Sequence, residues 1–201
     1  MATIYSSERS VPGLAGKFFN GSFRSTIADG NIGTFPLNST NNSSNVTLTN
    51  GMPSTNHNSG VNLWPYITYG TSIGNSYGFI AIGYFLAPTS GTYTFYTSSD
   101  DGSGMWIGES ALHGFARSKN NAVLDNNLGG AQPNTKRSGS ISLTANKVYA
   151  VRIVHEEGGG GDNLTFSWSG PSISETTDLT GYFRTPYLNG SIKGDFFNRD
   201  L

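Results

Sequence analysis

The sequence predicts an all-β fold, an antiparallel β-sandwich with long loops and extended N- and C-terminal arms. Short apolar or alternating segments recur along the 201 residues between stretches rich in Gly and Asn, which is typical of a sandwich. No segment keeps the apolar period of an amphipathic helix. The composition agrees, because 12% of the residues are charged and 27 are glycine, whereas helical bundles are rich in Ala, Glu, Lys and Leu.

The first part of the chain contains few strand signals. Residues 1–12 predict a polar N-terminal arm, and the apolar residues 13–19 predict the first strand. Residues 38–60 consist almost wholly of Asn, Ser, Thr and Gly. We therefore expect surface loops there, around one short edge strand at 46–48.

Strand signals strengthen in the middle of the chain. A continuous apolar and aromatic run at 77–86 predicts a buried strand, and the alternation at 91–97 places Tyr93 and Phe95 on one face. Further strands are predicted at 105–107, 140–143, 147–154 and 164–168. Two of the tryptophans, Trp106 and Trp168, lie within these strands and are expected in the core. Trp64 precedes Pro65 between loops and is expected to be exposed.

The sandwich domain is expected to span residues 13–171 and to close near Pro171. Residues 172–201 form a C-terminal tail that contains Tyr182 and Phe196 and is too aromatic for a simple linker. Two interpretations remain open for this tail. It packs back on the domain, or it docks to other protein subunits.

Charge and cysteine content exclude several classes of protein. The net charge is -1 without a basic cluster, so nucleic acid is not an expected partner. No apolar run is long enough for membrane insertion. The absence of cysteine excludes disulfides and thiolate metal sites. The N-terminal residues lack the features of a signal peptide, and we expect display on a virion or a cell-surface appendage.

Carboxylates are concentrated in two short Gly-rich segments. Residues 98–104 contain Asp100 and Asp101, and residues 155–163 contain two adjacent glutamates and Asp162. Adjacent carboxylates repel each other, and neither segment contains Lys or Arg. Calcium would stabilise them, because it binds carboxylate and backbone carbonyl oxygens in irregular geometry. The alternative is that both segments are ordinary exposed turns, in which Asp and Gly are common.

These segments resemble PA14 domains, the β-sandwich modules of bacterial toxins, glycosidases, yeast flocculins and bacterial adhesins. The resemblance covers residues 13–171 and is most specific in the Ser-Asp-Asp-Gly-Ser motif at 99–103, the Trp-Ile-Gly motif at 106–108 and the Glu/Gly-rich segment before a strand that ends at Trp168. Further matching residues lie at 13–19, 91–98, 129–130, 139–143 and 149–153.

The resemblance implies a calcium site that binds sugar. In the carbohydrate-binding members, two consecutive aspartates joined by a cis peptide bond hold a calcium ion (Ca²⁺), and vicinal hydroxyls of a sugar complete its coordination. The metal ligands implied for this chain are Asp100, Asp101, Asp162 and the carbonyls of Gly160 and Gly161. The residues implied at the sugar are Asp100, Asp101, Glu157 and Asn163.

Two functions are therefore compatible with the sequence. The first is a calcium-dependent carbohydrate-binding adhesion module that binds a cell-surface glycan. The alternative is a structural or assembly protein of a viral particle or surface appendage, which uses the PA14-like sandwich as a rigid module. An enzyme is not expected, because the acid and nucleophile of a glycosidase lie about 5–10 Å apart across the substrate rather than at adjacent positions.

Overall fold

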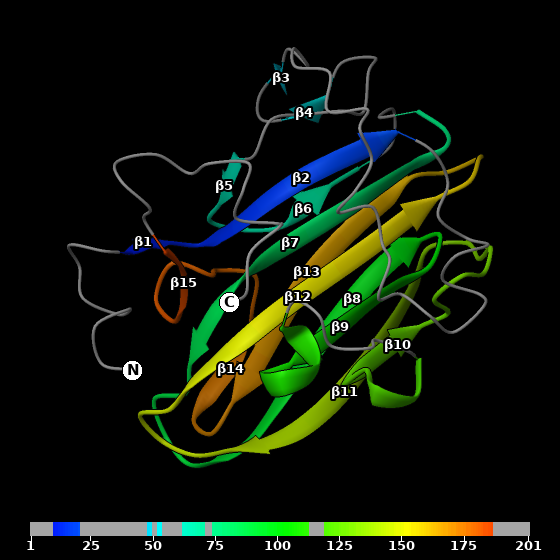
Figure 1. The fold of residues 1–201 in the computed structure, drawn as a ribbon. Coiled ribbons are helices and arrows are strands. Elements are labelled where there is room, and N and C mark those ends of the chain that lie inside the picture. Colours follow the sequence, from blue (N-terminus) through cyan, green and yellow to red (C-terminus); the bar gives the residue numbers. More distant parts are fainter. Residues whose placement is uncertain are drawn as a thin grey trace.

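The structure is a computed structural model that describes residues 10–20, 48–49, 52–53, 62–70, 74–112 and 119–186. Two antiparallel sheets pack against each other (Figure 1), which confirms the predicted all-β sandwich. The described residues contain two short 3₁₀ helices, η2 (Gly108–Ala111) and η3 (Lys119–Asn121), and no α-helix.

The eight-stranded sheet is called the large sheet below. It contains β1 (Ser10–Pro12), β2 (Leu14–Asn20), β5 (Asn62–Trp64), β7 (Tyr77–Leu86), β9 (Ser103–Ile107), β10 (Leu124–Asn126), β12 (Val148–Glu157) and β15 (Phe183–Pro186). Its main order is β1-β15-β7-β12-β9-β10, and β2 pairs with both β7 and β5.

The five-stranded sheet is called the small sheet. It contains β6 (Thr68–Tyr69), β8 (Gly91–Asp100), β11 (Thr135–Leu143), β13 (Asn163–Gly170) and β14 (Ile173–Thr176). The order is β11-β8-β13-β14, and β6 also pairs with β13. A separate pair is formed by β3 (Leu48–Thr49) and β4 (Met52–Pro53).

The main core lies between the two sheets and is strongly aromatic. Tyr93 and Phe95 of β8 are both buried on its inner face, as the alternation predicts. Phe85 of β7 lies against Phe95 with ring centroids 5.9 Å apart, and against Trp168 of β13 at 5.3 Å. Edge-to-face contacts of this kind add to the free energy gained by burying the rings.

Strand β7 is buried on both faces, which explains its continuous apolar sequence. Its inner residue Phe79 belongs to the main core, whereas Ile80 and Ile82 belong to a second cluster on the other face of the large sheet. That cluster includes Trp106 of β9 and Ala111 of η2. A strand covered on both faces has no need for polar alternation.

The prediction that Trp64 is exposed is wrong. Its side chain is 7% exposed, and its ring lies 5.2 Å from that of Phe79 and 5.9 Å from that of Phe18. The backbone of Gly16 provides the space, because a Cβ there would lie 2.6 Å from the indole. Strand β5 is only three residues long, too short to show a period in the sequence. Trp106 and Trp168 are buried as expected.

The sheets extend beyond the predicted span of 13–171. Strand β1 pairs with β15, and β14 pairs with β13. The amide of Gly13 donates to the carbonyl of Phe183 at 2.9 Å, and Thr185 Oγ1 donates to the carbonyl of Gly13 at 2.9 Å. Residues 173–186 of the predicted tail therefore pack back on the domain.

Other predicted segments lie outside the described residues. These are the start of the N-terminal arm at 1–9, most of the loops at 38–60, and the tail from 187 to 201, which contains Phe196. In the part of the chain that the structure describes, no helix is long and apolar enough to cross a membrane.

Phe183 tests whether β15 is an integral part of the sandwich. We expect Phe183→Ala to lower the free energy of unfolding by about 3–5 kcal/mol, because it leaves a cavity among Phe85, Phe166 and Trp168. Denaturant unfolding measures this change. The control Tyr66→Ala removes an aromatic ring that is 57% exposed and should change stability by no more than about 0.5 kcal/mol. Equal stability of the two variants would contradict this packing.

Candidate functional site

Three carboxylates meet at one end of the sandwich. One oxygen from each of Asp100, Asp101 and Glu157 lies within 4.8 Å of the others. Asp101 and Glu157 are buried, and Asp100 is half-buried. The peptide bond between Asp100 and Asp101 is cis, as the resemblance implied. These three residues are called the acidic cluster below.

The acidic cluster joins the two sheets. Asp100 is the last residue of β8 in the small sheet, and Glu157 is the last residue of β12 in the large sheet. Asp101 and Gly102 connect β8 to β9, which pairs with β12. The amide of Glu156 donates to the carbonyl of Gly102 at 3.0 Å. This link holds the connection against the end of β12.

Backbone donors orient the carboxylate of Asp101. Its Oδ1 accepts a hydrogen bond from the amide of Gln132 at 2.9 Å, and its Oδ2 accepts one from the amide of Gly158 at 3.0 Å. The two amides therefore fix the direction of the Asp101 carboxylate within the acidic cluster.

Gly161 lies directly against the carboxylate of Asp100. A Cβ at Gly161 would be 2.6 Å from Asp100 Oδ2, closer than real Cβ atoms approach an oxygen. The neighbouring Gly160 has φ of +111°, in the region that favours glycine. Its amide donates to Asn75 Oδ1 at 3.3 Å. These two glycines are needed for the loop to fold over Asp100.

The buried imidazole of His155 contacts the backbone of Asp100. Its Nε2 lies 3.0 Å from the carbonyl oxygen of Asp100, and its Nδ1 lies 2.7 Å from the hydroxyl of Tyr69. Because a carbonyl only accepts, Nε2 carries the proton and Tyr69 donates to Nδ1. Burial lowers the pKa of His155 to about 4, so the ring is neutral near pH 7.

Asp162 lies next to the acidic cluster but outside it. This residue is buried, and its Oδ2 accepts a hydrogen bond from the amide of Gly74 at 2.9 Å. Burial raises the pKa of Tyr77, and the negative charge of Asp162 raises it further. Asn163 begins β13 and pairs with Asp100 in the ladder. The structure thus places the predicted residues of the second segment around the cluster, with only Glu157 inside it.

Sequence reasoning missed how far β12 extends. The strand was predicted to end at Val154, but it continues through Glu157. Glu156 and Glu157 are both fully buried, and alternation directs them to opposite faces of the strand. Glu156 Oε1 lies 2.8 Å from the position of a Cβ on Gly102. The run at 147–154 is almost wholly apolar, and no pattern in the sequence indicates that the strand continues through the polar residues 155–157.

The geometry of the acidic cluster fits calcium. Calcium binds oxygen ligands at about 2.3–2.6 Å, so two ligands of one ion lie no more than about 5 Å apart. The oxygen separations of up to 4.8 Å satisfy this limit. The donor set consists of carboxylates beside a glycine loop rich in backbone carbonyls, which is a set of hard oxygen ligands. His155 is the one histidine of the described residues, and both of its ring nitrogens make other contacts, so its imidazole is not available as a zinc ligand.

A family model for the GLEYA domain matches residues 77–170, which include the whole acidic cluster. No curated protein sequence matches the chain. Solved structures are similar in fold. The epithelial adhesin 9 A domain from Candida glabrata, in complex with Galβ1-3GlcNAc, has a TM-score of 0.61 and 12% identity, over 90% of this chain and 93% of that chain.

Two further structures extend the comparison. A PA14 sugar-binding domain from an RTX adhesin has a TM-score of 0.57 and 17% identity, over 87% of this chain and 99% of that chain. An anti-sigma factor domain-containing protein from Clostridium clariflavum has a TM-score of 0.54 and 17% identity, over 89% of this chain. The chain spans 50% of the length of that protein, and 50% of another protein of the same description.

The protein has the fold of PA14 domains and of the epithelial adhesin A domains. The resemblance that the sequence indicated is therefore confirmed at the level of the fold. The structural likenesses lie at 12–18% identity. They establish the architecture that carries the acidic cluster.

Gly161 tests whether the acidic cluster binds a cation. We expect Gly161→Ala to weaken binding of Ca²⁺ or Tb³⁺ by at least about tenfold, because the new Cβ displaces the carboxylate of Asp100. The control is Gly159→Ala, whose Cβ would meet only Asn75 at an ordinary 3.8 Å. Terbium luminescence measures both affinities. Equal affinities in the two variants would contradict a role for Asp100 in cation binding.

A substitution of Tyr69 tests the hydrogen bond between Tyr69 and His155. We expect Tyr69→Phe to lower the free energy of unfolding by about 1–3 kcal/mol, because it leaves the buried Nδ1 of His155 without its donor. Tyr66→Phe removes the hydroxyl of an exposed ring and serves as the control. Thermal or denaturant unfolding of both variants provides the measurement. A Tyr69→Phe variant no less stable than the control would refute the assignment of Tyr69 as the donor to Nδ1.

Proposed function

We propose that this protein is a calcium-dependent carbohydrate-binding adhesion module. The observation that carries the proposal is the clustering of Asp100, Asp101 and Glu157, whose carboxylate oxygens lie within 4.8 Å of one another at the end of a PA14-type sandwich. Such a cluster places three negative charges around one point. A calcium ion bound there would supply a positive centre that two adjacent sugar hydroxyls can coordinate in place of water.

Several residues of this chain would hold the ion. The carboxylates of Asp100, Asp101 and Glu157 provide the charge, and the carbonyls of Gly160 and Gly161 are proposed as neutral ligands. Asp162, held by the amide of Gly74, is proposed as a further ligand or as a nearby negative charge that strengthens binding of the cation. Asn163 is proposed to contact the sugar that is bound at the ion, together with the residues of the acidic cluster.

The comparisons support a sugar as the ligand. The matched adhesin domains were crystallised with Galβ1-3GlcNAc, Galβ1-4GlcNAc and β-lactose, and another matched domain is described as sugar-binding. We infer that this chain likewise binds a glycan on a cell surface and performs no catalysis. Display on a virion or a cell-surface appendage would let several copies bind together, which compensates for weak binding at each site.

Calorimetry of the metal-free protein tests the proposal. We expect calcium to bind the EDTA-treated protein, and simple sugars to give binding heat only after calcium is added. Asp101→Asn should weaken calcium binding by at least about tenfold, because it replaces a charged ligand with a neutral amide. Glu109→Gln, which removes a charge from the exposed side of η2, is the matched control and should behave as the wild type.

Each other outcome changes the conclusion. Calcium binding without any sugar heat would favour the alternative function, a rigid structural or assembly module of a particle or appendage. Equal calcium affinity of Asp101→Asn and the control would place the ion elsewhere. A complete lack of calcium binding would overturn the proposal and leave the fold unchanged.

A further inference from the structure

The outer face of the small sheet is rich in hydroxyl groups. Every outward residue of β8 from Thr92 to Ser98 carries a hydroxyl, and so does every outward residue of β13 from Thr165 to Ser169. The ladder aligns them in rows across the sheet. The rows are Lys136–Ser98–Thr165, Ser138–Tyr96–Ser167 and Ser140–Thr94–Ser169.

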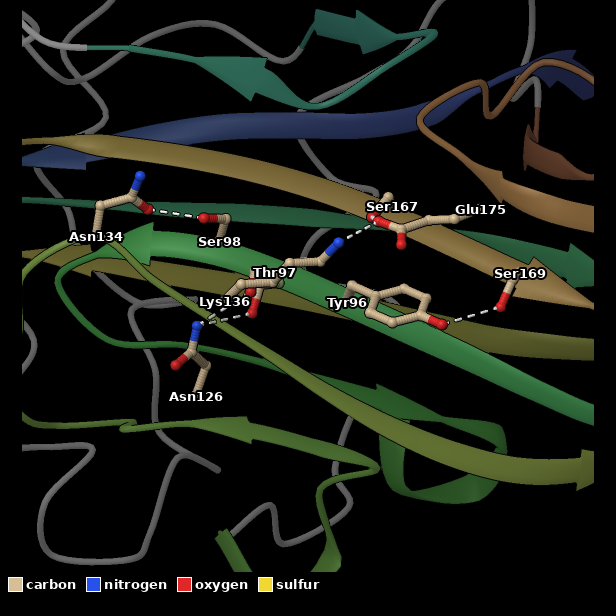
Figure 2. Close-up of polar contacts among 9 residues, drawn as sticks. All are labelled: Tyr96, Thr97, Ser98, Asn126, Asn134, Lys136, Ser167, Ser169 and Glu175. Atoms are coloured by element: carbon tan, nitrogen blue, oxygen red, sulfur yellow. Dashed lines mark hydrogen bonds and ion pairs between the residues drawn. The ribbon is translucent and has the colours of Figure 1, made fainter.

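A hollow of about 440 Å³ lies over this face, and it is called the outer groove below. It is lined by five hydroxyl-bearing residues and by two charged residues, one from β11 and one from β14. The seven residues are Ser98, Thr165, Ser167, Thr176, Thr177, Lys136 and Glu175. Figure 2 shows Lys136, Ser167 and Glu175 pointing toward one another across the strands.

Hydrogen bonds link Lys136, Glu175 and Ser167 in the outer groove. These three linked side chains are called the polar chain below. Lys136 Nζ donates to Glu175 Oε1 at 2.6 Å, and Ser167 Oγ donates to the same oxygen at 2.6 Å. Lys136 Nζ also lies 4.8 Å from the ring centroid of Tyr96. The side chains of Lys136 and Glu175 keep 52% and 38% of their surface exposed. An ammonium has three donors and a carboxylate two oxygens, so this pair keeps capacity for a ligand.

One end of the outer groove is lined by Ser98, which lies on the same strand as Asp100 of the acidic cluster. Asp100 follows Ser98 by two residues on β8, and alternation places both on the outer side. The partners of these residues on β13 are Asn163 and Thr165. Two residues of a strand rise by about 7 Å. The backbone positions of Ser98, which lines the groove, and of Asp100 therefore lie about 7 Å apart along β8.

We propose that the outer groove binds the further sugar residues of an oligosaccharide whose terminal residue is bound at the acidic cluster. This inference rests on the proposed function and specifies its ligand, an oligosaccharide that lies along β8 and β13. Sugar residues beyond the first contact Ser98 and Thr165, and then the polar chain formed by Ser167, Glu175 and Lys136.

The chemistry of the outer groove fits a neutral, polyhydroxylated ligand. Hydroxyl side chains both donate and accept, as sugar hydroxyls do, and the charges of Lys136 and Glu175 compensate each other. The centre of a protein–protein interface is usually enriched in apolar and aromatic residues. Tyr66 is the exposed large hydrophobic residue of the described part of the chain, and it does not line the groove.

Chain-length dependence of sugar affinity tests the inference. The calcium-loaded protein is titrated with two probe series, galactose, lactose and lacto-N-tetraose, and mannose, mannobiose and mannotriose. In the series that binds, we expect the longest sugar to bind about tenfold more tightly than the monosaccharide. The double variant Ser98→Ala, Thr165→Val should reduce this ratio about threefold to tenfold, because it removes hydrogen bonds to the longer ligand.

A matched variant on the same face is the control. Thr94 Oγ1 and Ser140 Oγ form a similar hydroxyl pair at 2.9 Å, but neither residue lines the outer groove. Thr94→Val with Ser140→Ala should keep the ratio of the wild type. NMR of ¹⁵N-labelled wild-type protein gives an independent measurement. The longest sugar should shift the amides of Ser98, Thr165 and Glu175, and the monosaccharide should leave Glu175 unchanged.

Failure of the inference and failure of the proposed function give different results. If the monosaccharide binds only with calcium and longer sugars bind no more tightly, the outer groove is not used and the proposed function stands. An equal ratio in both double variants, with no amide shift at Glu175, leads to the same conclusion. If no probe binds in a calcium-dependent way, the proposed function and the inference both fail. If the longest sugar binds equally tightly in calcium and in EDTA, its binding does not require an ion at the acidic cluster. This result would overturn the inference.

Discussion

The meeting of two strand ends from different sheets is the constraint on which the site depends. Asp100 ends β8 in the small sheet and Glu157 ends β12 in the large sheet, yet their carboxylate oxygens lie within 4.8 Å. Buried negative charges are unfavourable unless hydrogen bonds or a cation stabilise them. Amides of Gln132 and Gly158 stabilise Asp101 from two loops. A divalent cation at this point would also hold the two sheets together.

Most of the fold could be predicted because the long strands carry local signals. The apolar run of β7 and the alternation of β8 identify these strands directly from the sequence. The short strands β1, β5, β14 and β15 could not be found in this way, because three or four residues do not define a period. Their positions depend on partners far along the chain, such as the bond between Gly13 and Phe183. For the same reason no local pattern indicates that Trp64 is buried.

The acidic cluster could be predicted only in part. Asp100 and Asp101 stand out because adjacent carboxylates are unusual in a chain with 12% charged residues. The contacts that orient them are long-range. Tyr69 reaches His155 across 86 positions, and Gly74 reaches Asp162 across 88. No local pattern encodes such contacts, so the supporting residues could be recognised only after the strands were placed.

Strand β8 connects the core, the acidic cluster and the outer groove. Its inner residues Tyr93 and Phe95 pack in the core, its outer residues lead to Ser98, and its last residue is Asp100. A shift of one residue in its register would exchange the two faces. The aromatic rings would then point to solvent and the hydroxyl rows into the core. The packing of the core therefore fixes the position of Asp100, and the stability of the sandwich and the geometry of the candidate site depend on the same register.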